Sequence, residues 1–143
     1  MSHEINLQIK PTPTIFFVEE DNGVRALLTK ALRQDGYRLL VASSLEDAKE
    51  WVSFDHNIQA DLLLLNLIRK SPEEAIKIGR ELRKHAKYDG RTPLVVMAEN
   101  AVSELDGQDV NVHENDWICY YDDDSHQLHK LVARLLNREV RQH

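Results

Sequence analysis

Cysteine, basic charge and long apolar runs are all scarce in this sequence of 143 residues. The single cysteine, Cys119, excludes an internal disulfide and a multi-cysteine metal site. No stretch approaches the roughly 18 consecutive apolar residues of a membrane span, and residues 1–13 are too polar for a signal peptide. With 18 Lys and Arg against 24 Asp and Glu, the net charge of −6 disfavours direct binding to nucleic acid or to an anionic membrane. We therefore expect a cytoplasmic protein that folds without disulfides.

The remaining composition is that of one folded domain. Hydrophobic residues make up 42% and charged residues 29% of the chain, which is ordinary for a globular protein, and a chain of this length can bury a sizeable core. The polar residues 1–13 include Pro11 and Pro13 and predict a flexible lead-in. We assign residues 14–137 to the domain and residues 138–143 to a tail that continues the last helix.

Strand-like and helix-like patterns alternate along the domain. Short apolar runs rich in β-forming residues predict five strands, at residues 14–18, 37–42, 61–67, 93–97 and 117–121. Apolar residues at helical spacing follow the cap residues Asp21 or Asn22, Ser43 or Ser44, and Ser71, and recur in residues 125–141. Within residues 99–115 the pattern is weaker, and Val102 and Leu105 suggest a short helix that Gly107 interrupts.

This alternation predicts an α/β fold, with a five-stranded parallel sheet between two layers of helices. In open sheets of this kind, ligands bind beyond the carboxyl ends of the strands. The residues that follow the predicted strands are therefore the candidates for a site: Glu19, Glu20, Asn66, Ala98, Glu99 and residues 120–122.

Five segments together resemble the receiver domain of bacterial response regulators, the CheY-like family, over residues 14–137. They are VEEDNGVRALL, Gly36-Tyr37, Ala42-Ser43 with Glu46-Asp47-Ala48, DLLLLNL and TPLVVMAE. The resemblance implies the three-layer, doubly wound, flavodoxin-like form of the fold, with strand order 2-1-3-4-5. It also implies a role in two-component or phosphorelay signalling, in which a histidine kinase phosphorylates an aspartate at the end of the third strand.

Position by position, the resemblance carries over only in part. The acidic pair that holds Mg²⁺ in the family corresponds to Glu19 and Glu20, but the phosphoacceptor position is Asn66. The Ser/Thr position is Ala98, and the Lys position falls on Tyr121, or on Tyr120 if the alignment shifts by one residue. The chain therefore resembles a degenerate pseudo-receiver that lacks the phosphoacceptor aspartate.

The substituted residues do not support phosphoryl transfer. An acyl phosphate forms on a carboxylate, and the carboxamide nitrogen of Asn66 is a poor nucleophile. Ala98 lacks the hydroxyl of the family's Ser or Thr, and Tyr121 lacks the positive charge of the family's Lys, so neither group is present to stabilise a phosphoryl group. We therefore predict no catalytic residues, no enzyme activity and no cofactor. A weak Mg²⁺ site at Glu19 and Glu20 is the alternative.

Several other residues have an ordinary interpretation beside a functional one. Cys119 lies in a predicted strand, and its ordinary interpretation is a buried, small apolar side chain. Tyr120 and Tyr121 either fill the vacated pocket or face a partner. Basic residues lie along one face of the last helix, as a solvated face or as a docking strip for an acidic partner: Lys130, Arg134, Arg138 and Arg141.

The first hypothesis for function is signalling through phosphorylation-independent contact with a signalling protein or a second copy of the chain. The family's interaction face consists of the fourth helix, the fifth strand and the last helix. Its candidate residues here are Trp117, Tyr120, Tyr121, Lys130 and Arg134. The alternatives are an active phosphorelay receiver that uses a neighbouring carboxylate (Glu19, Glu20 or Asp21) and a sensor that binds a small molecule at the strand ends.

Overall fold

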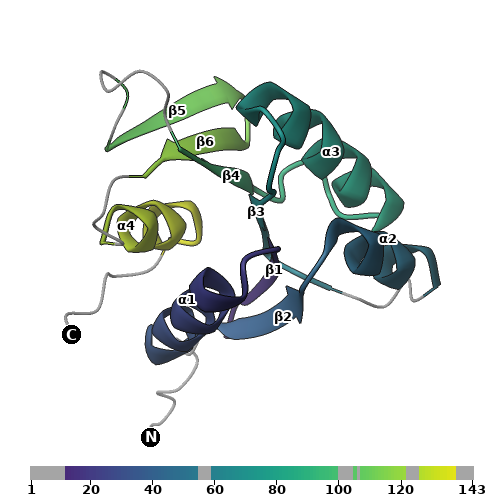
Figure 1. Ribbon diagram of the computed structural model, residues 1–143, viewed down its shortest axis with the longest axis horizontal. Helices are drawn as coiled ribbons and strands as arrows, with labels where there is room; N and C mark the ends of the chain where they lie inside the picture. The colour runs from purple at the N-terminus through teal and green to yellow at the C-terminus, as the bar shows by residue number, and fades with distance from the viewer. Residues whose placement is uncertain (1–11, 55–58, 100–104, 106, 122–125, 138–143) are drawn as a thin grey trace, which may run out of the picture.

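The computed structural model describes residues 12–54, 59–99, 105, 107–121 and 126–137. Their centre is one six-stranded sheet with the order β2-β1-β3-β4-β6-β5 (Figure 1). Five strands run parallel: β1 (Thr14–Glu19), β2 (Arg38–Ala42), β3 (Leu62–Asn66), β4 (Leu94–Ala98) and β6 (Asp116–Tyr120). The sixth strand, β5 (Gln108–His113), pairs antiparallel with β6 at the edge.

The helices cover both faces of this sheet (Figure 1). Two of them, α1 (Asn22–Gln34) and α4 (His126–Leu135), pack on one face, and α2 (Leu45–Phe54) and α3 (Pro72–His85) pack on the other. The predicted doubly wound, flavodoxin-like fold and the order of its parallel strands are confirmed. Within the described part of the chain, no helix is long and apolar enough to cross a membrane.

Local side-chain chemistry fixes where the helices begin. Asp21 caps α1, because its Oδ1 accepts the backbone N–H of Val24 at 2.8 Å. The Ser44 hydroxyl accepts the N–H of Asp47 at the start of α2. At α3, Ser71 and Glu74 form a capping box in which each side chain accepts the other's backbone N–H. These caps place each strand-to-helix loop at the same edge of the sheet.

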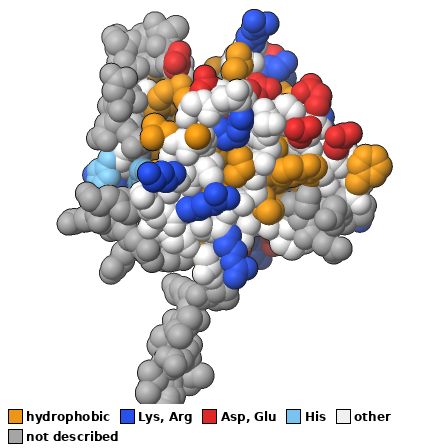
Figure 2. Space-filling view, turned by 60° about the horizontal axis from the view of Figure 1, so that its bottom comes forward, with side chains coloured by type: hydrophobic (Ala, Val, Ile, Leu, Met, Phe, Trp, Pro, Cys, Tyr) orange, Lys and Arg blue, Asp and Glu red, His pale blue; other side chains and the backbone are white. Residues whose placement is uncertain are grey.

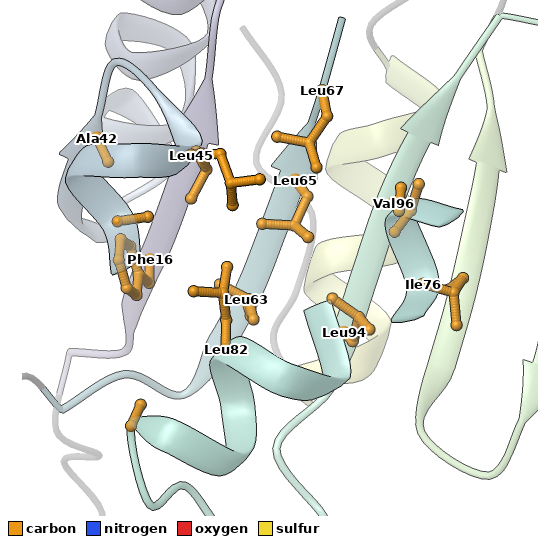
Figure 3. Packing of buried hydrophobic residues seen from close by; sticks show 14 of the residues in the cluster. Phe16, Ala42, Leu45, Leu63, Leu65, Leu67, Ile76, Leu82, Leu94 and Val96 are labelled. Atoms are coloured by element: carbon orange, nitrogen blue, oxygen red, sulfur yellow. The ribbon is translucent and has the colours of Figure 1, made fainter. Parts of the chain in front are cut away.

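The core consists of two apolar clusters, one on each side of the sheet. Strand β3 is buried on both faces, and its leucines at 62–65 are all fully buried. Leu63 and Leu65 belong to the cluster under α2 and α3, much of which is drawn in Figure 3, whereas Leu62 and Leu64 belong to the cluster under α1 and α4. Gly79 lets α3 approach closely, since a Cβ there would lie 2.5 Å from a Leu94 methyl carbon.

The structure differs from the sequence prediction after β4. Residues 100–104, where the short helix was expected to begin, lie outside the described residues, and Gln108–His113 form a strand. The segment DVNV alternates polar and apolar residues as a strand does, and it leads into a tight turn at residues 114–115. The Asn111 amide supports this turn by donating to the carbonyls of His113, Glu114 and Asp116, at 3.4, 3.2 and 3.1 Å.

A buried ion-pair network ties the hairpin of β5 and β6 to α3. Asp116 is 1% exposed and accepts from Arg80 Nε and Arg83 Nη1, each at 2.7 Å. Burial alone would raise the pKa of Asp116, but the two arginines outweigh burial and leave this pKa below its ordinary value. The edge hairpin is therefore an anchored part of the fold.

Candidate functional site

The candidate residues meet beyond the carboxyl ends of the central strands. Glu19 ends β1 and is the cross-strand partner of Asn66, which ends β3. Ala98 ends β4 and is the partner of Tyr120, which ends β6, so Tyr121 follows at the same edge. The parallel topology thus brings four separate segments of the chain to one pocket.

Glu19 is the buried centre of this pocket. Its side chain is 0% exposed, and both carboxylate oxygens accept hydrogen bonds. Asn66 Nδ2 donates to Oε1 at 2.7 Å, and the Asp21 backbone N–H donates to Oε2 at 3.1 Å. Burial raises the pKa of Glu19 above its ordinary value, and the hydrogen bonds from Asn66 and Asp21 offset this only in part.

Glu20 and Asp21 have separate structural roles beside Glu19. Glu20 Oε1 accepts the backbone N–H of Ile68 at 2.7 Å and so links the loop after β1 to the loop after β3. Asp21 caps α1. Arg25 also holds this loop, because its Nη1 donates to the Glu19 carbonyl at 2.9 Å. The three adjacent carboxylates therefore do not converge on one point.

Ala98 and Tyr121 form the opposite side of the pocket. Ala98 is buried and offers no side-chain donor. The Tyr121 hydroxyl donates to Glu99 Oε1 over a long 3.4 Å. Burial, together with the carboxylate of Glu99, raises the pKa of Tyr121 to about 12, so the phenol stays neutral at physiological pH. This side of the pocket carries no positive charge.

Between these walls lies a cavity of about 380 Å³. The loop after β3 adds Arg69 and Lys70 to its lining. Lys70 stands where the resembled family has proline, and Arg69 takes the left-handed conformation with φ 63°. Sequence reasoning missed Arg69, and the signal that could have identified it was its position two residues beyond the end of the predicted strand at residues 61–67.

The donor set does not fit Mg²⁺. Magnesium prefers a near-octahedral set of oxygens with carboxylates supplying negative charge. Both Glu19 oxygens already accept N–H donors, Glu20 turns to Ile68, and Asn66 presents its amide nitrogen to Glu19. Among the residues with a described position, no group of three or more His, Cys, Asp or Glu could hold a metal ion.

The structure separates the two tyrosines. Tyr121 packs with the cluster under α1 and α4 and lines the cavity, whereas Tyr120 packs with the cluster on the other face. Of the two, Tyr121 is therefore the one that faces the strand-end pocket. Trp117 is half-buried on the α4 side, with the Arg134 guanidinium 4.9 Å from its ring centroid, and Lys130 is exposed on α4.

The expected interaction face changes accordingly. The sequence predicted that a fourth helix within residues 99–115 would form part of this face. In the described part of that segment, the structure has strand β5. Beside α4, this end of the sheet therefore consists of β5 and β6, and Tyr120 packs on the opposite side of the sheet. Arg138 and Arg141 of the basic strip lie outside the described residues.

Solved structures of response regulator receiver domains share this fold. A response regulator receiver protein from Sinorhizobium medicae is 21% identical with a TM-score of 0.66, and the match covers 88% of this chain and 95% of that one. The receiver domain of a sensor histidine kinase from Pseudomonas aeruginosa, whose structure holds a magnesium ion in its active-site cleft, is 17% identical with a TM-score of 0.61, covering 89% and 99%. The receiver domain of the hybrid histidine kinase CckA is 25% identical with a TM-score of 0.57, covering 86% and 98%.

These likenesses define the class of fold. The chain has the receiver-domain architecture over nearly the whole length of the structures it matches. No protein-family model matches the sequence, and no curated protein matches it. The architecture and the altered strand-end pocket are therefore the basis for inferring what the chain does.

Proposed function

We propose that this chain is a receiver-like signalling domain of the cytoplasm that acts by protein–protein contact, without phosphorylation at Asn66 and without enzyme activity. The observation that carries this proposal is the 2.7 Å hydrogen bond from Asn66 Nδ2 to the buried Glu19 carboxylate. Through this hydrogen bond, the side chain at the position that corresponds to the family's phosphoacceptor makes a structural contact. A carboxamide in this role is not a nucleophile for phosphoryl transfer.

The other walls of the pocket support the same conclusion. Ala98 offers no hydroxyl, and the neutral Tyr121 phenol offers no positive charge to an incoming phosphoryl group. A neighbouring carboxylate is a poor substitute acceptor, because both oxygens of Glu19 accept hydrogen bonds and Asp21 caps α1. We therefore favour signalling by contact over an active phosphorelay.

Intact-mass analysis after exposure to acetyl phosphate and Mg²⁺ tests this proposal. An ordinary phosphorylatable receiver domain, treated alongside, shows that the reagents work. We expect the wild-type chain to gain no phosphoryl group. A gain by the wild type would overturn the proposal, and peptide mapping would then identify the carboxylate that carries the group.

The surface proposed for the signalling partner is the face formed by β5, β6 and α4. Trp117 and Arg134 stack there, and Lys130 lies on the same helix. Trp117→Ala and Arg134→Ala should weaken capture of a partner or of a second copy of the chain. Phe54→Ala is a matched control, because Phe54 is 84% exposed on α2, which packs on the opposite side of the sheet. If only the control weakens capture, this surface is not the interface.

A small-molecule sensor remains the second candidate because of the strand-end cavity of about 380 Å³. Two cations, Arg69 and Lys70, line it together with Glu19 and Glu99. A thermal-shift screen of polar metabolites tests this alternative. Stabilisation that Lys70→Ala abolishes would favour the sensor, and the absence of any stabilising compound would favour signalling by contact.

A further inference from the structure

A second hollow, separate from the strand-end pocket, runs along α1 on its side toward β2. Its volume is about 650 Å³. Arg25, Lys30 and Arg33 line it, and among the described residues no carboxylate does so. Figure 2, which turns α1 and β2 toward the viewer, shows Lys and Arg side chains spread across the middle of the face and Asp and Glu side chains gathered at its upper right. The hollow is therefore a basic region on a chain whose net charge is −6.

Two of the three cations are available to a ligand. Arg25 is held in place, since it donates to the Glu19 carbonyl and to the Asn22 side chain. Lys30 and Arg33 are exposed and form no hydrogen bond or ion pair with any described residue. The nearest carboxylate in sequence, Asp35, is 8% exposed and pairs with His129 of α4, so it does not neutralise them.

The rest of the hollow can contact a polypeptide. Its exposed lining is mostly apolar, and Ala26 and Val41 contribute to it. Thr29 lines the hollow as well, but its hydroxyl oxygen is buried and out of a ligand's reach.

We infer that this hollow docks an acidic segment of a partner protein, which places carboxylates against Lys30 and Arg33. Apolar side chains of the segment cover Ala26 and Val41. The inference deepens the proposed function, since it specifies the chemistry of one partner, but it does not depend on whether Asn66 is phosphorylated. A nucleic acid fits less well, because the chain is acidic overall and the described part of the hollow has no aromatic ring to stack on a base.

The test is an NMR titration of the ¹⁵N-labelled full chain with a synthetic Glu-rich amphipathic peptide at low salt. We expect shift changes centred on residues 22–41 and affinity that falls as salt is added. Lys30→Glu with Arg33→Glu should weaken binding about tenfold, because both contacts become repulsive.

A charge-matched control separates docking from general attraction. Lys49→Glu with Lys77→Glu makes the same change of charge in the groove between α2 and α3 and should leave binding unchanged. Equal losses in both double variants, or no shift changes on α1, would overturn the inference. If a DNA duplex bound the same hollow more tightly than the peptide does, the ligand would be a nucleic acid and the inference of an acidic protein partner would be wrong. The phosphorylation assay of the preceding section is independent of all these outcomes.

Discussion

Replacing Asn66 with aspartate tests the contact on which the strand-end pocket depends. In the wild type, Asn66 Nδ2 donates to Glu19 Oε1 at 2.7 Å, and the Glu19 side chain is 0% exposed. The Asn66→Asp change removes this donor and places a second carboxylate against the first. Two carboxylates at such a separation do not both ionise, so the folded variant must take up a proton near neutral pH.

The cost of this change in the free energy of unfolding has two parts. Loss of a hydrogen bond to a charged acceptor costs about 1.5–3 kcal/mol. Taking up the proton that relieves the repulsion costs roughly 1.4 kcal/mol more for each unit by which the pH exceeds the pKa of the pair. We therefore expect Asn66→Asp to destabilise the fold by about 3–4 kcal/mol at neutral pH, which corresponds to a fall of roughly 10 °C in Tm for a domain of this size.

The dependence on pH distinguishes this mechanism from a simple packing defect. Because burial raises the pKa of Glu19, the folded chain binds this proton at a higher pH than the unfolded chain does. Stability from this group is therefore fully present below its ordinary pKa of 4.5 and is lost as pH rises through the folded value. A second carboxylate strengthens the effect, so the difference between Asn66→Asp and the wild type should shrink as the pH is lowered.

Urea denaturation at neutral and mildly acidic pH, with and without Mg²⁺, measures these effects. Asn66→Ala is the control, since it removes the donor without adding charge and should show a smaller loss with little added pH dependence. Mg²⁺ should stabilise Asn66→Asp and leave the wild type unchanged, because only the variant presents a second carboxylate. If Asn66→Asp matches the wild type at neutral pH without a divalent cation, the account of the pocket is wrong.

Three further predictions concern contacts that hold the fold together. Asp116→Ala should cost about 3 kcal/mol in urea denaturation, because it leaves two arginines without their buried partner. Since the pKa of Asp116 is lowered, the stability that Asp116 supplies should be present above its ordinary pKa of 3.8 and be lost as pH falls through the lower folded value. If the wild type and Asp116→Ala unfold with the same pH dependence in an acid titration, this explanation is wrong. His129→Leu should destabilise the chain by about 2 kcal/mol, because it leaves the buried carboxylate of Asp35 without its partner on α4, and a melting temperature equal to that of the wild type would exclude such a role. Gly79→Ala should lower stability by about 1 kcal/mol despite the better helix propensity of alanine, because its Cβ would lie 2.5 Å from a Leu94 methyl carbon; a more stable variant would mean that the leucine moves aside at little cost.

Much of the fold is predictable from the sequence because its signals are local. The continuous leucine run in β3 predicts a central strand buried on both faces, and residues 62–65 are fully buried. The capping pattern at Ser71 and Glu74 predicts the start of α3, and both hydrogen bonds of the capping box are present. Periodicity and cap chemistry act over a few residues, so one sequence is enough to identify them.

The edge hairpin was not predicted, and the reason is physical. The apolar residues of the segment DVNV are few, and Val112 is 42% exposed, so no strong burial pattern marks the strand. What holds the hairpin in place is the pairing of Asp116 with arginines more than 30 residues away on α3. Such a contact depends on the tertiary arrangement and leaves no signal in the local spacing of residues.

The site was predictable as a location but not as a set of contacts. Parallel topology alone brings Glu19, Asn66 and Tyr121 to one edge of the sheet. Whether Glu19 and Glu20 converge on a cation depends on which way each side chain turns. The structure turns them apart, with Glu19 inward to Asn66 and Glu20 to the backbone of Ile68.

The substitution at position 66 and the poor fit to Mg²⁺ have one physical cause. A carboxylate at position 66 beside the buried Glu19 would need a cation or a proton to offset the repulsion between them. The Asn66 amide removes this need, because it is neutral and supplies the N–H that Glu19 accepts. Once Glu19 is satisfied in this way, no negative charge remains at position 66 for a cation or a phosphoryl donor to act on. The pocket is then held by internal hydrogen bonds, which is why the proposed function assigns the signalling contacts to a surface outside it.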